Sequence, residues 1–416
     1  MNSYVKTFLR GSAVSLAGAI LLGVINFFTR RQLSVELSIA DYGTFYGIFS
    51  FYSIVFCFTE LGLAQSGTVM IASVAREKRQ RDKIFSNLFW IKTLLASICA
   101  IAAGIFCSWQ YGELSGVVIF FFSGFFVCKT LNNALQALWN GQKKYTVQQS
   151  FYTTTAILIF LCLSVVYQIT LMGAVFFFFF ATMTTLGGGL LYSRITGLGK
   201  LSIGIDRHIS KTLLANGGMI AVSTTLISAT YHLDSVMLNA LQGAESVGMY
   251  NVALPIMQIV QAAMVFPAVF LPIAVDLNKN QEYLKLLSFV RYSLLVTLGA
   301  LLPVGIFFYY SAEFLINLLF DERYIAAAPA IPILCLGLVF FTAGNFFMQI
   351  MIAIKKIHAM ALISLITFLC NLVMNYTLIK KMNFCGAAWA MLLTHAIMAL
   401  LCYIVLVYCI KKLNRP

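Results

Sequence analysis

The sequence predicts an all-α polytopic membrane protein with about twelve transmembrane helices. Of its 416 residues, 61% are hydrophobic and only 10% are charged, and the mean hydropathy is +0.89. A soluble domain carries roughly a quarter charged residues, so this chain lacks the polar surface that water requires. The apolar runs are continuous and about 20 residues long, as in membrane-spanning helices, whereas barrel strands are shorter and alternate. Composition therefore excludes a soluble fold, and run length excludes a transmembrane barrel.

Twelve apolar runs are the predicted spans, and short polar segments separate them. The second, eighth and tenth are longer than the others, which indicates tilting or kinking. The run after Arg10 is interpreted as the first span and as its own signal anchor, because no small-residue cleavage site follows it. In chain order the spans lie near residues 11–30, 44–71, 86–107, 115–138, 147–168, 171–192, 213–233, 248–273, 286–309, 327–353, 359–379 and 386–410.

Lysine and arginine residues are concentrated in alternate loops. One set of loops and termini carries 21 of the 28 basic residues, the opposite set carries 5, and Lys92 and Lys129 lie inside spans. Short cytoplasmic loops carry the excess of basic residues, so this bias predicts that both termini are cytoplasmic. It also explains the net charge of +14 as a topology signal, which argues against nucleic-acid binding.

The two halves of the chain share short elements. A Gly-x-aromatic element opens the second span at Gly43 and recurs at the start of the eighth span at Gly248. The pair Lys143-Lys144 after the fourth span recurs as Lys355-Lys356 after the tenth. These matches predict six helices duplicated to twelve, with residues 1–205 forming an N-terminal lobe and residues 206–416 a C-terminal lobe. Parallel repeats of this kind are typical of transporters with a substrate path between the halves.

The fourth span carries a polar stripe on one face of the helix. Polar groups inside a span are costly unless they face protein or water. The stripe either lines a hydrated cavity that binds hydroxyl or phosphate groups, or it hydrogen-bonds to neighbouring helices while the lysine reaches an interface. Its members are Lys129, Asn132, Asn133, Gln136 and Asn140.

Other polar residues extend the set of candidate substrate-binding residues. Arg30 and Arg31 lie on the predicted periplasmic side, where they either bind phosphate bidentately or anchor the helix end. Lys92 and Arg291 lie near predicted cytoplasmic ends of spans, where they either face the substrate path or reach the membrane surface. The remaining candidates are the amides Asn26, Asn251 and Gln258.

Carboxylates are rare within the predicted spans. Glu60 is the only one well inside a span, so it is either an ion-coupling site for a proton or cation or the partner of a basic residue. Asp41 and Asp234 are predicted to be turn or cap residues at periplasmic helix ends. The sequence contains no Ser/His/Asp arrangement, metal-ligand spacing or close carboxylate pair, so we expect no enzyme activity, no cofactor and no metal site.

Loose motifs of small and aromatic residues follow one another along nearly the whole chain. They are Tyr42-Gly43-Thr44-Phe45, Glu60-Leu61-Gly62-Leu63, Asp234-Ser235-Val236-Met237-Leu238, Val247–Ala253, Leu318-Leu319-Phe320, Asn371, Asn375 and Gly386-Ala387-Ala388. In this order the chain resembles the O-antigen and polysaccharide flippases of the multidrug/oligosaccharidyl-lipid/polysaccharide (MOP) exporter superfamily. The resemblance implies two six-helix lobes in a V around a cationic cavity, and an undecaprenyl-pyrophosphate-linked oligosaccharide as substrate.

The predicted function is therefore a flippase that moves an O-antigen or related lipid-linked repeat unit to the periplasmic leaflet of the bacterial inner membrane by alternating access. The expected partners are this substrate, membrane lipids, and the polysaccharide polymerase and chain-length machinery. One alternative is a multidrug or cation antiporter of the same fold, which would need acidic residues buried in a lobe. Another is a membrane glycosyltransferase or polymerase, which would need large periplasmic loops or a catalytic acidic cluster.

Overall fold

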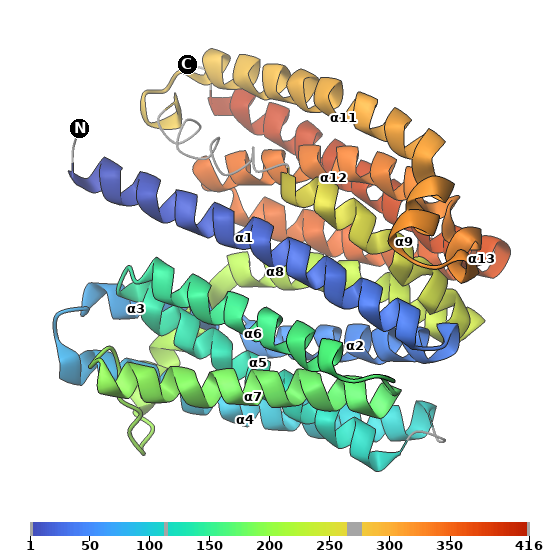
Figure 1. The fold of residues 1–416 in the computed structure, drawn as a ribbon. Helices are drawn as coiled ribbons and strands as arrows, with labels where there is room; N and C mark the ends of the chain where they lie inside the picture. The colour runs from blue at the N-terminus through green and yellow to red at the C-terminus, as the bar shows by residue number, and fades with distance from the viewer. Residues whose placement is uncertain (1–2, 112–114, 264–276, 414–416) are drawn as a thin grey trace. The chain divides into compact units, whose positions relative to one another are not determined.

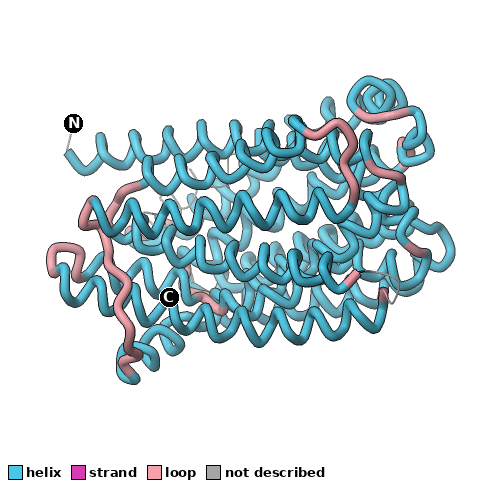
Figure 2. Tube along the Cα trace, turned by 60° about the horizontal axis from the view of Figure 1, so that its bottom comes forward, coloured by secondary structure: helices cyan, strands magenta, loops and turns pink. Residues whose placement is uncertain are grey.

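A computed structural model describes residues 3–111, 115–263 and 277–413, and every regular element in these ranges is a helix (Figure 2). The chain divides into two compact units. Unit 1 comprises Met1–Leu37 and Ile48–Thr225, and unit 2 comprises Ser38–Gly47 and Leu226–Pro416. The sequence predicted a single boundary between two lobes, at residues 205 and 206. The units break instead inside a helix at Thr225, and a short segment near residue 40 groups with unit 2.

Unit 1 is built around a central helix. Helix α5 packs against α3, α4 and α7, and α1 pairs with α6 (Figure 1). Leu135, Leu138 and Trp139 of α5 are at most 2% exposed, because three neighbouring helices cover this face. The helices are α1 (Ser3–Glu36), α2 (Ile39–Glu60), α3 (Leu63–Ser73), α4 (Lys78–Gln110), α5 (Gly116–Gly141), α6 (Tyr145–Val165), α7 (Leu171–Ile195) and the first part of α8 (Arg207–Gln242).

Unit 2 has a similar organisation around helix α12, which packs against α9, α11 and α13 (Figure 1). Buried apolar side chains of α12 and α13, such as Phe347, Ile350 and Cys402, form its core. After the end of α8, the elements are α9 (Ala244–Ala263), α11 (Tyr283–Leu319), the short 3-10 helix η1 (Glu322–Ala327), α12 (Ala330–Ala353) and α13 (Ile357–Leu413).

The twelve predicted spans agree with the helices. Within the described residues, each predicted span falls on one helix, apart from the second, which covers α2 and α3. Helix α13 contains two spans, and the non-helical backbone of Asn383, with φ of 53°, lies between them. Among the described residues, seven helical segments are long and apolar enough to cross a membrane. The prediction of an all-α polytopic fold is therefore confirmed.

The duplicated lysine pairs adopt the same local structure. Lys143 follows α5 with φ of 60°, and Lys355 follows α12 with φ of 59°. The N–H of Lys144 donates to the carbonyl of Trp139 at 2.8 Å, and the N–H of Lys356 donates to that of Met351 at 2.8 Å. Both helices thus end in a left-handed cap that satisfies a terminal carbonyl group. This shared cap supports the predicted duplication.

The second predicted span is broken rather than continuous. Helix α2 ends at Glu60, and α3 begins at Leu63. Between them Leu61 has φ of 31° and Gly62 has φ of 71°, a backbone region that glycine enters without steric cost. The Gly62 in the sequence is therefore the signal for this break, and the break places Glu60 at a helix end.

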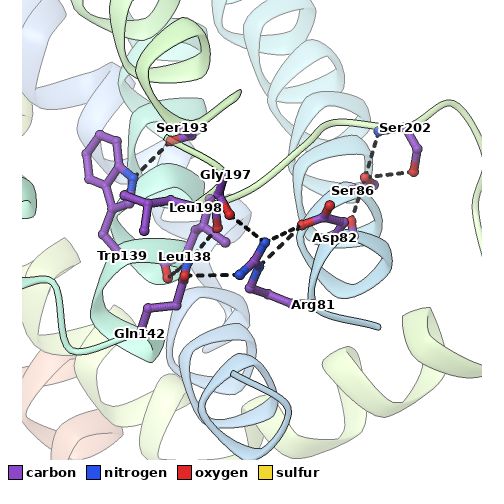
Figure 3. A network of polar contacts seen from close by, with 10 residues as sticks. All are labelled: Arg81, Asp82, Ser86, Leu138, Trp139, Gln142, Ser193, Gly197, Leu198 and Ser202. Carbon is purple, nitrogen blue, oxygen red and sulfur yellow. Dashed lines mark hydrogen bonds and ion pairs between the residues drawn. The ribbon is translucent and has the colours of Figure 1, made fainter. Parts of the chain in front are cut away.

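The connector between α7 and α8, residues 196–206, forms hydrogen bonds with other parts of unit 1 at several points along its length (Figure 3). Arg81, which is 4% exposed, donates to the carbonyl of Gly197 at 2.9 Å, and Gln142 donates to that of Leu198 at 2.7 Å. Ser86 accepts a hydrogen bond from the N–H of Ser202 at 2.9 Å. These bonds satisfy backbone groups that a loose loop would leave to water.

Asp206 ends the connector as the N-cap of α8. Its carboxylate accepts hydrogen bonds from the backbone N–H groups of His208 and Ile209 at 2.9 and 3.2 Å. The N–H groups of Ile209 and His208 hold the pKa of Asp206 below its usual value, because they stabilise the charged form. The N–H of Asp206 also donates to Oδ1 of Asn87 on α4 at 2.7 Å, which holds the start of α8 against unit 1.

The sidedness of the chain remains a prediction, and reporter fusions test it. Fusions after Lys144, after Lys356 and at the C-terminus should report cytoplasm, because basic residues are concentrated in these segments. A fusion at Gly243, between α8 and α9, should report the opposite side. A periplasmic C-terminus would contradict the assigned orientation.

Candidate functional site

A polar cluster lies at the break between α2 and α3 in unit 1. We call Glu60, Lys92, Lys129 and Asn133 the Glu60 cluster; they come from α2, α4 and α5. The ammonium of Lys92 lies 2.8 Å from Oε1 of Glu60, and Nδ2 of Asn133 donates to the same oxygen at 2.9 Å. Within the described residues, the other oxygen, Oε2, has no hydrogen-bond partner. The cluster therefore contains a fixed carboxylate with one oxygen available to a ligand.

Burial is uneven across this ion pair. The Lys92 side chain is 0% exposed, whereas the Glu60 side chain is 32% exposed. Lys92 therefore does not reach the membrane surface, and the sequence interpretation that it snorkels there is wrong. The ammonium neutralises and orients Glu60, and the carboxylate is the member of the pair that faces outward.

Lys129 lies among aromatic rings. Its ammonium is 5.1 Å from the ring centroids of Phe49 and Phe126 and 5.8 Å from that of Phe125. The negative face of an aromatic ring attracts a cation at such distances. The charges of Lys92 and Glu60 cancel. The ammonium of Lys129 therefore gives the Glu60 cluster a net charge of +1.

Two asparagines of the α5 stripe form hydrogen bonds between helices. Asn132 donates to the carbonyl of Thr182 on α7 at 3.1 Å, which is a helix–helix hydrogen bond. Asn133 binds Glu60, as described above. Gln136 and Asn140 continue the same face and are half-buried. The structure thus brings Lys129 and Asn133 to Glu60 and uses Asn132 for packing.

The other candidate residues are dispersed. On α1, Asn26 and Arg31 are exposed and Arg30 is half-buried. Arg291 is exposed on α11 in unit 2. Asn251 is 2% exposed and donates to Ser235 at 3.1 Å, so it joins α9 to α8 within unit 2. The side chain of Gln258 lies outside the described residues.

A second polar cluster is buried in unit 2. We call Asp234, Tyr250, Asn371, Asn375 and Thr394 the Asp234 cluster; each is at most 1% exposed. Tyr250 donates to Oδ2 of Asp234 at 2.8 Å. Asn375 and Asn371 donate to Oδ1 at 2.7 and 3.2 Å. Asn371 also donates to the hydroxyl of Thr394 at 3.2 Å.

The position of Asp234 corrects the sequence interpretation. Asp234 lies within α8, not at a turn or cap, and Glu60 is therefore not the only carboxylate inside a helix of this membrane protein. Within the described residues, no lysine or arginine forms an ion pair with Asp234. A buried carboxylate held only by neutral donors is costly and is usually functional in a membrane protein.

Hydrogen-bond donors of Asn371, Asn375 and Tyr250 surround the Asp234 carboxylate, and the amide oxygens of the cluster lie beyond them. Oδ1 of Asn375 is buried and has no hydrogen-bond partner among the described residues. Oδ1 of Asn371 accepts from Asn375 at 3.0 Å, and the Thr394 hydroxyl lies beside it. Carboxylate, amide and hydroxyl oxygens are the donors that hard cations prefer. The cluster can therefore accept a proton as it stands, and it could bind a small cation if the asparagine amides turned their oxygens towards Asp234.

Sequence reasoning named Asp234, Asn371, Asn375 and the segment that contains Tyr250, but not Thr394, and it did not predict that these residues meet. Asn371 and Asn375 are four residues apart, so they share a helix face, and this spacing was the available signal. Their approach to Asp234, 137 and 141 residues away, depends on tertiary packing of α13 against α8.

Comparison with known families agrees with these features. Residues 8–277 match the model of the polysaccharide biosynthesis protein family. The chain belongs to this family. One relative is an uncharacterized membrane protein of Methanocaldococcus jannaschii, 25% identical over 413 residues, with 93% of this chain and 81% of the relative covered.

Solved structures of MOP superfamily transporters share the fold of this family member. An inward-facing multidrug resistance transporter of the MATE family aligns with a TM-score of 0.78 at 14% identity, covering 95% of each chain. The outward-facing conformation of such a transporter gives a TM-score of 0.65 at 14% identity, covering 98% of this chain and 96% of the other. A transporter from Pyrococcus furiosus, described as having a binding pocket of reversed polarity, aligns with a TM-score of 0.63 at 13% identity. The alignment covers 98% of this chain and 97% of the other.

Proposed function

We propose that this protein is a flippase for a lipid-linked oligosaccharide, such as an undecaprenyl-pyrophosphate-linked O-antigen repeat unit, in the bacterial inner membrane. Membership of the polysaccharide biosynthesis family and the MOP transporter fold support a membrane transporter in this process. The observation that carries the finer proposal is the Glu60 cluster, which has one net positive charge beside a carboxylate with a free oxygen.

The chemistry of the Glu60 cluster suits a sugar pyrophosphate. The Lys129 ammonium would pair with a phosphate oxygen, and Oε2 of Glu60 would accept a hydrogen bond from a sugar hydroxyl. The half-buried amides of Gln136 and Asn140 would bind further hydroxyl groups. These groups replace water around a head group that cannot cross hydrocarbon unaided.

The Asp234 cluster supports coupling of this transport to a proton or monovalent cation. It provides the buried acidic group that a cation antiporter needs, so it also favours a second candidate, a multidrug or cation antiporter. The Lys129 charge favours an anionic substrate and hence the flippase, because an organic cation would be repelled by it.

Reconstituted vesicles distinguish these functions. Vesicles containing only this protein should expose a lipid-linked oligosaccharide to an impermeant sugar-modifying reagent faster than empty vesicles do. Lys129→Met should slow this movement roughly 10- to 100-fold, because a charge-assisted contact contributes about 1.5–3 kcal/mol. The matched control is Lys285→Met, at an exposed lysine on α11.

Each alternative has its own outcome in this assay. Uptake of an organic cation without movement of the oligosaccharide would identify an antiporter. A new glycosidic or phosphodiester bond in the recovered oligosaccharide would identify an enzyme. Equal rates for the unaltered protein and Lys129→Met would remove Lys129 from the substrate path.

A further inference from the structure

The connector between α7 and α8 follows the side of α4. Arg81 of α4 donates to the carbonyl of Gly197 at 2.9 Å, and Ser86 accepts from the N–H of Ser202 at 2.9 Å (Figure 3). One turn further along α4, Nε1 of Trp90 donates to the carbonyl of Ser202 at 2.9 Å. Because nine positions of α4 separate Arg81 from Trp90, the connector runs roughly 14 Å along this helix.

Trp90 marks the depth of this contact in the membrane. The predicted apolar span of α4 begins at residue 86, so Trp90 lies one turn inside it. Tryptophan is enriched at membrane–water interfaces, where its ring lies in an apolar environment and its N–H finds a polar partner. The carbonyl of Ser202 is that partner, so this part of the connector lies at the level of the bilayer surface.

Two isoleucines of the connector point away from the protein. Ile203 is 99% exposed, and Ile205 is 63% exposed. The backbone on either side of them is fixed, because Ser202 is bound to α4 through both its N–H and its carbonyl, and the N–H of Asp206 donates to Asn87 at 2.7 Å. The connector therefore holds two branched apolar side chains outward, which is unfavourable in water and favourable in hydrocarbon.

Basic side chains lie on both sides of the isoleucines along the chain. Lys200, Arg207 and Lys211 are all exposed. Lys83 of α4 is exposed as well, and it lies close to Asp206: after the backbone N–H groups that Asp206 caps, the charge of Lys83 also lowers the pKa of this carboxylate. An apolar tip within a basic rim is the composition of segments that bind anionic lipid surfaces.

We call Lys200, Ile203, Ile205, Arg207 and Lys211 the connector patch. We infer that the connector patch binds the anionic phospholipid surface of the membrane, with its isoleucines in the outer part of the acyl region and its basic side chains on headgroup phosphates. At the depth of Trp90, lipid surrounds a membrane-spanning helix, so a soluble protein would have to displace lipid to reach the patch. A free phosphate ion would leave the isoleucines uncovered. The inference concerns contact with the bilayer and does not depend on what the protein transports.

A fluorophore at position 203 tests the depth of the connector patch. It is attached to an unnatural keto amino acid, because the ten native cysteines rule out specific thiol labelling. At 99% exposure the Ile203 side chain makes little packing contact, so the label should not disturb the fold. The labelled protein is reconstituted in vesicles of phosphatidylcholine and phosphatidylglycerol that carry a nitroxide quencher at a shallow or a deep acyl position. The shallow quencher should act more strongly than the deep one.

Two further labels on α4 calibrate the depth scale. Lys78 is exposed and precedes the apolar span, so a label at position 78 should be quenched weakly by both lipids. Ile101 is 65% exposed and lies within the span, so a label at position 101 should be quenched more strongly by the deep nitroxide. Quenching at position 203 as weak as at position 78 would place the patch in water, leave it to a soluble partner and overturn the inference.

The headgroup that carries the quencher tests the role of charge. At position 203, a nitroxide on phosphatidylglycerol should quench more strongly than the same nitroxide on phosphatidylcholine. Arg207→Gln combined with Lys211→Gln should lower this preference by about fivefold for each charge removed, which is the contribution of a basic residue close to an anionic surface. The matched control is Arg207→Lys combined with Lys211→Arg, which keeps both charges and should keep the preference.

The label at position 101 shows whether each variant is folded and inserted, because its quenching by the deep nitroxide should stay constant. Equal quenching at position 203 by the two headgroups overturns the inference. A preference for phosphatidylglycerol that survives the double glutamine variant overturns it as well, since the basic side chains would then not bind the headgroups.

Discussion

Replacing Glu60 with glutamine should destabilise the folded protein by about 3–5 kcal/mol, because removing one partner of a buried ion pair leaves the other charge uncompensated. The Lys92 side chain is 0% exposed, and its ammonium lies 2.8 Å from the Glu60 carboxylate. An amide oxygen can accept one hydrogen bond from this ammonium but cannot neutralise it. The measurement is the free energy of unfolding of the purified protein in micelles, from a denaturant titration.

Three further variants make this prediction specific. Glu60→Gln combined with Lys92→Met should recover most of the lost stability, since no buried charge remains. Lys92→Met alone should have a smaller effect than Glu60→Gln, because Glu60 is partly exposed. Glu282→Gln breaks an exposed pair with Lys285 and should change stability by about 1 kcal/mol or less. A loss in Glu60→Gln no larger than in Glu282→Gln would contradict the assigned ion pair.

Composition and run length were sufficient to predict the helical fold. In lipid, every backbone group must be satisfied within the segment, so long apolar runs have to form helices. Breaks within these runs were harder to predict. The apolar run around Gly62 continues through the break, so hydropathy gives no signal there. The break at Asn383 was predicted, because the polar residues Lys380 and Lys381 separate the last two apolar runs.

Side-chain partners were the least predictable part of the candidate site. Lys92 and Glu60 are 32 residues apart, and their pairing depends on how α4 packs beside the end of α2. A lysine near a predicted span end is compatible with both snorkelling and pairing, and only burial separates the two. Asp234 was assigned to a helix end because it precedes a predicted loop, whereas α8 continues to Gln242.

Asp234→Asn should reduce transport by at least about tenfold without lowering the amount of folded protein. The substitution preserves the shape of the side chain but removes the negative charge that would bind a proton or cation. It also removes a buried charge that has only neutral partners, so stability should be unchanged or higher. The measurement is the initial rate of oligosaccharide movement in vesicles with an imposed proton or sodium gradient, divided by folded protein.

The response of the transport rate to the ion gradient shows whether Asp234 binds the coupling ion or only packs between helices. If Asp234 binds the coupling ion, the variant should lose its response to the gradient, since nothing else in this cluster carries a charge that the ion can compensate. If Asp234 only joins α8 to α13, the response should persist at a reduced rate. Thr367→Val is the matched control on α13: Thr367 is 4% exposed, and the carbonyl of Ile363, at 2.8 Å, is the one partner of its hydroxyl among the described residues. A rate and gradient response in Asp234→Asn equal to those of Thr367→Val would exclude the Asp234 cluster from coupling and leave Glu60 as the remaining acidic candidate.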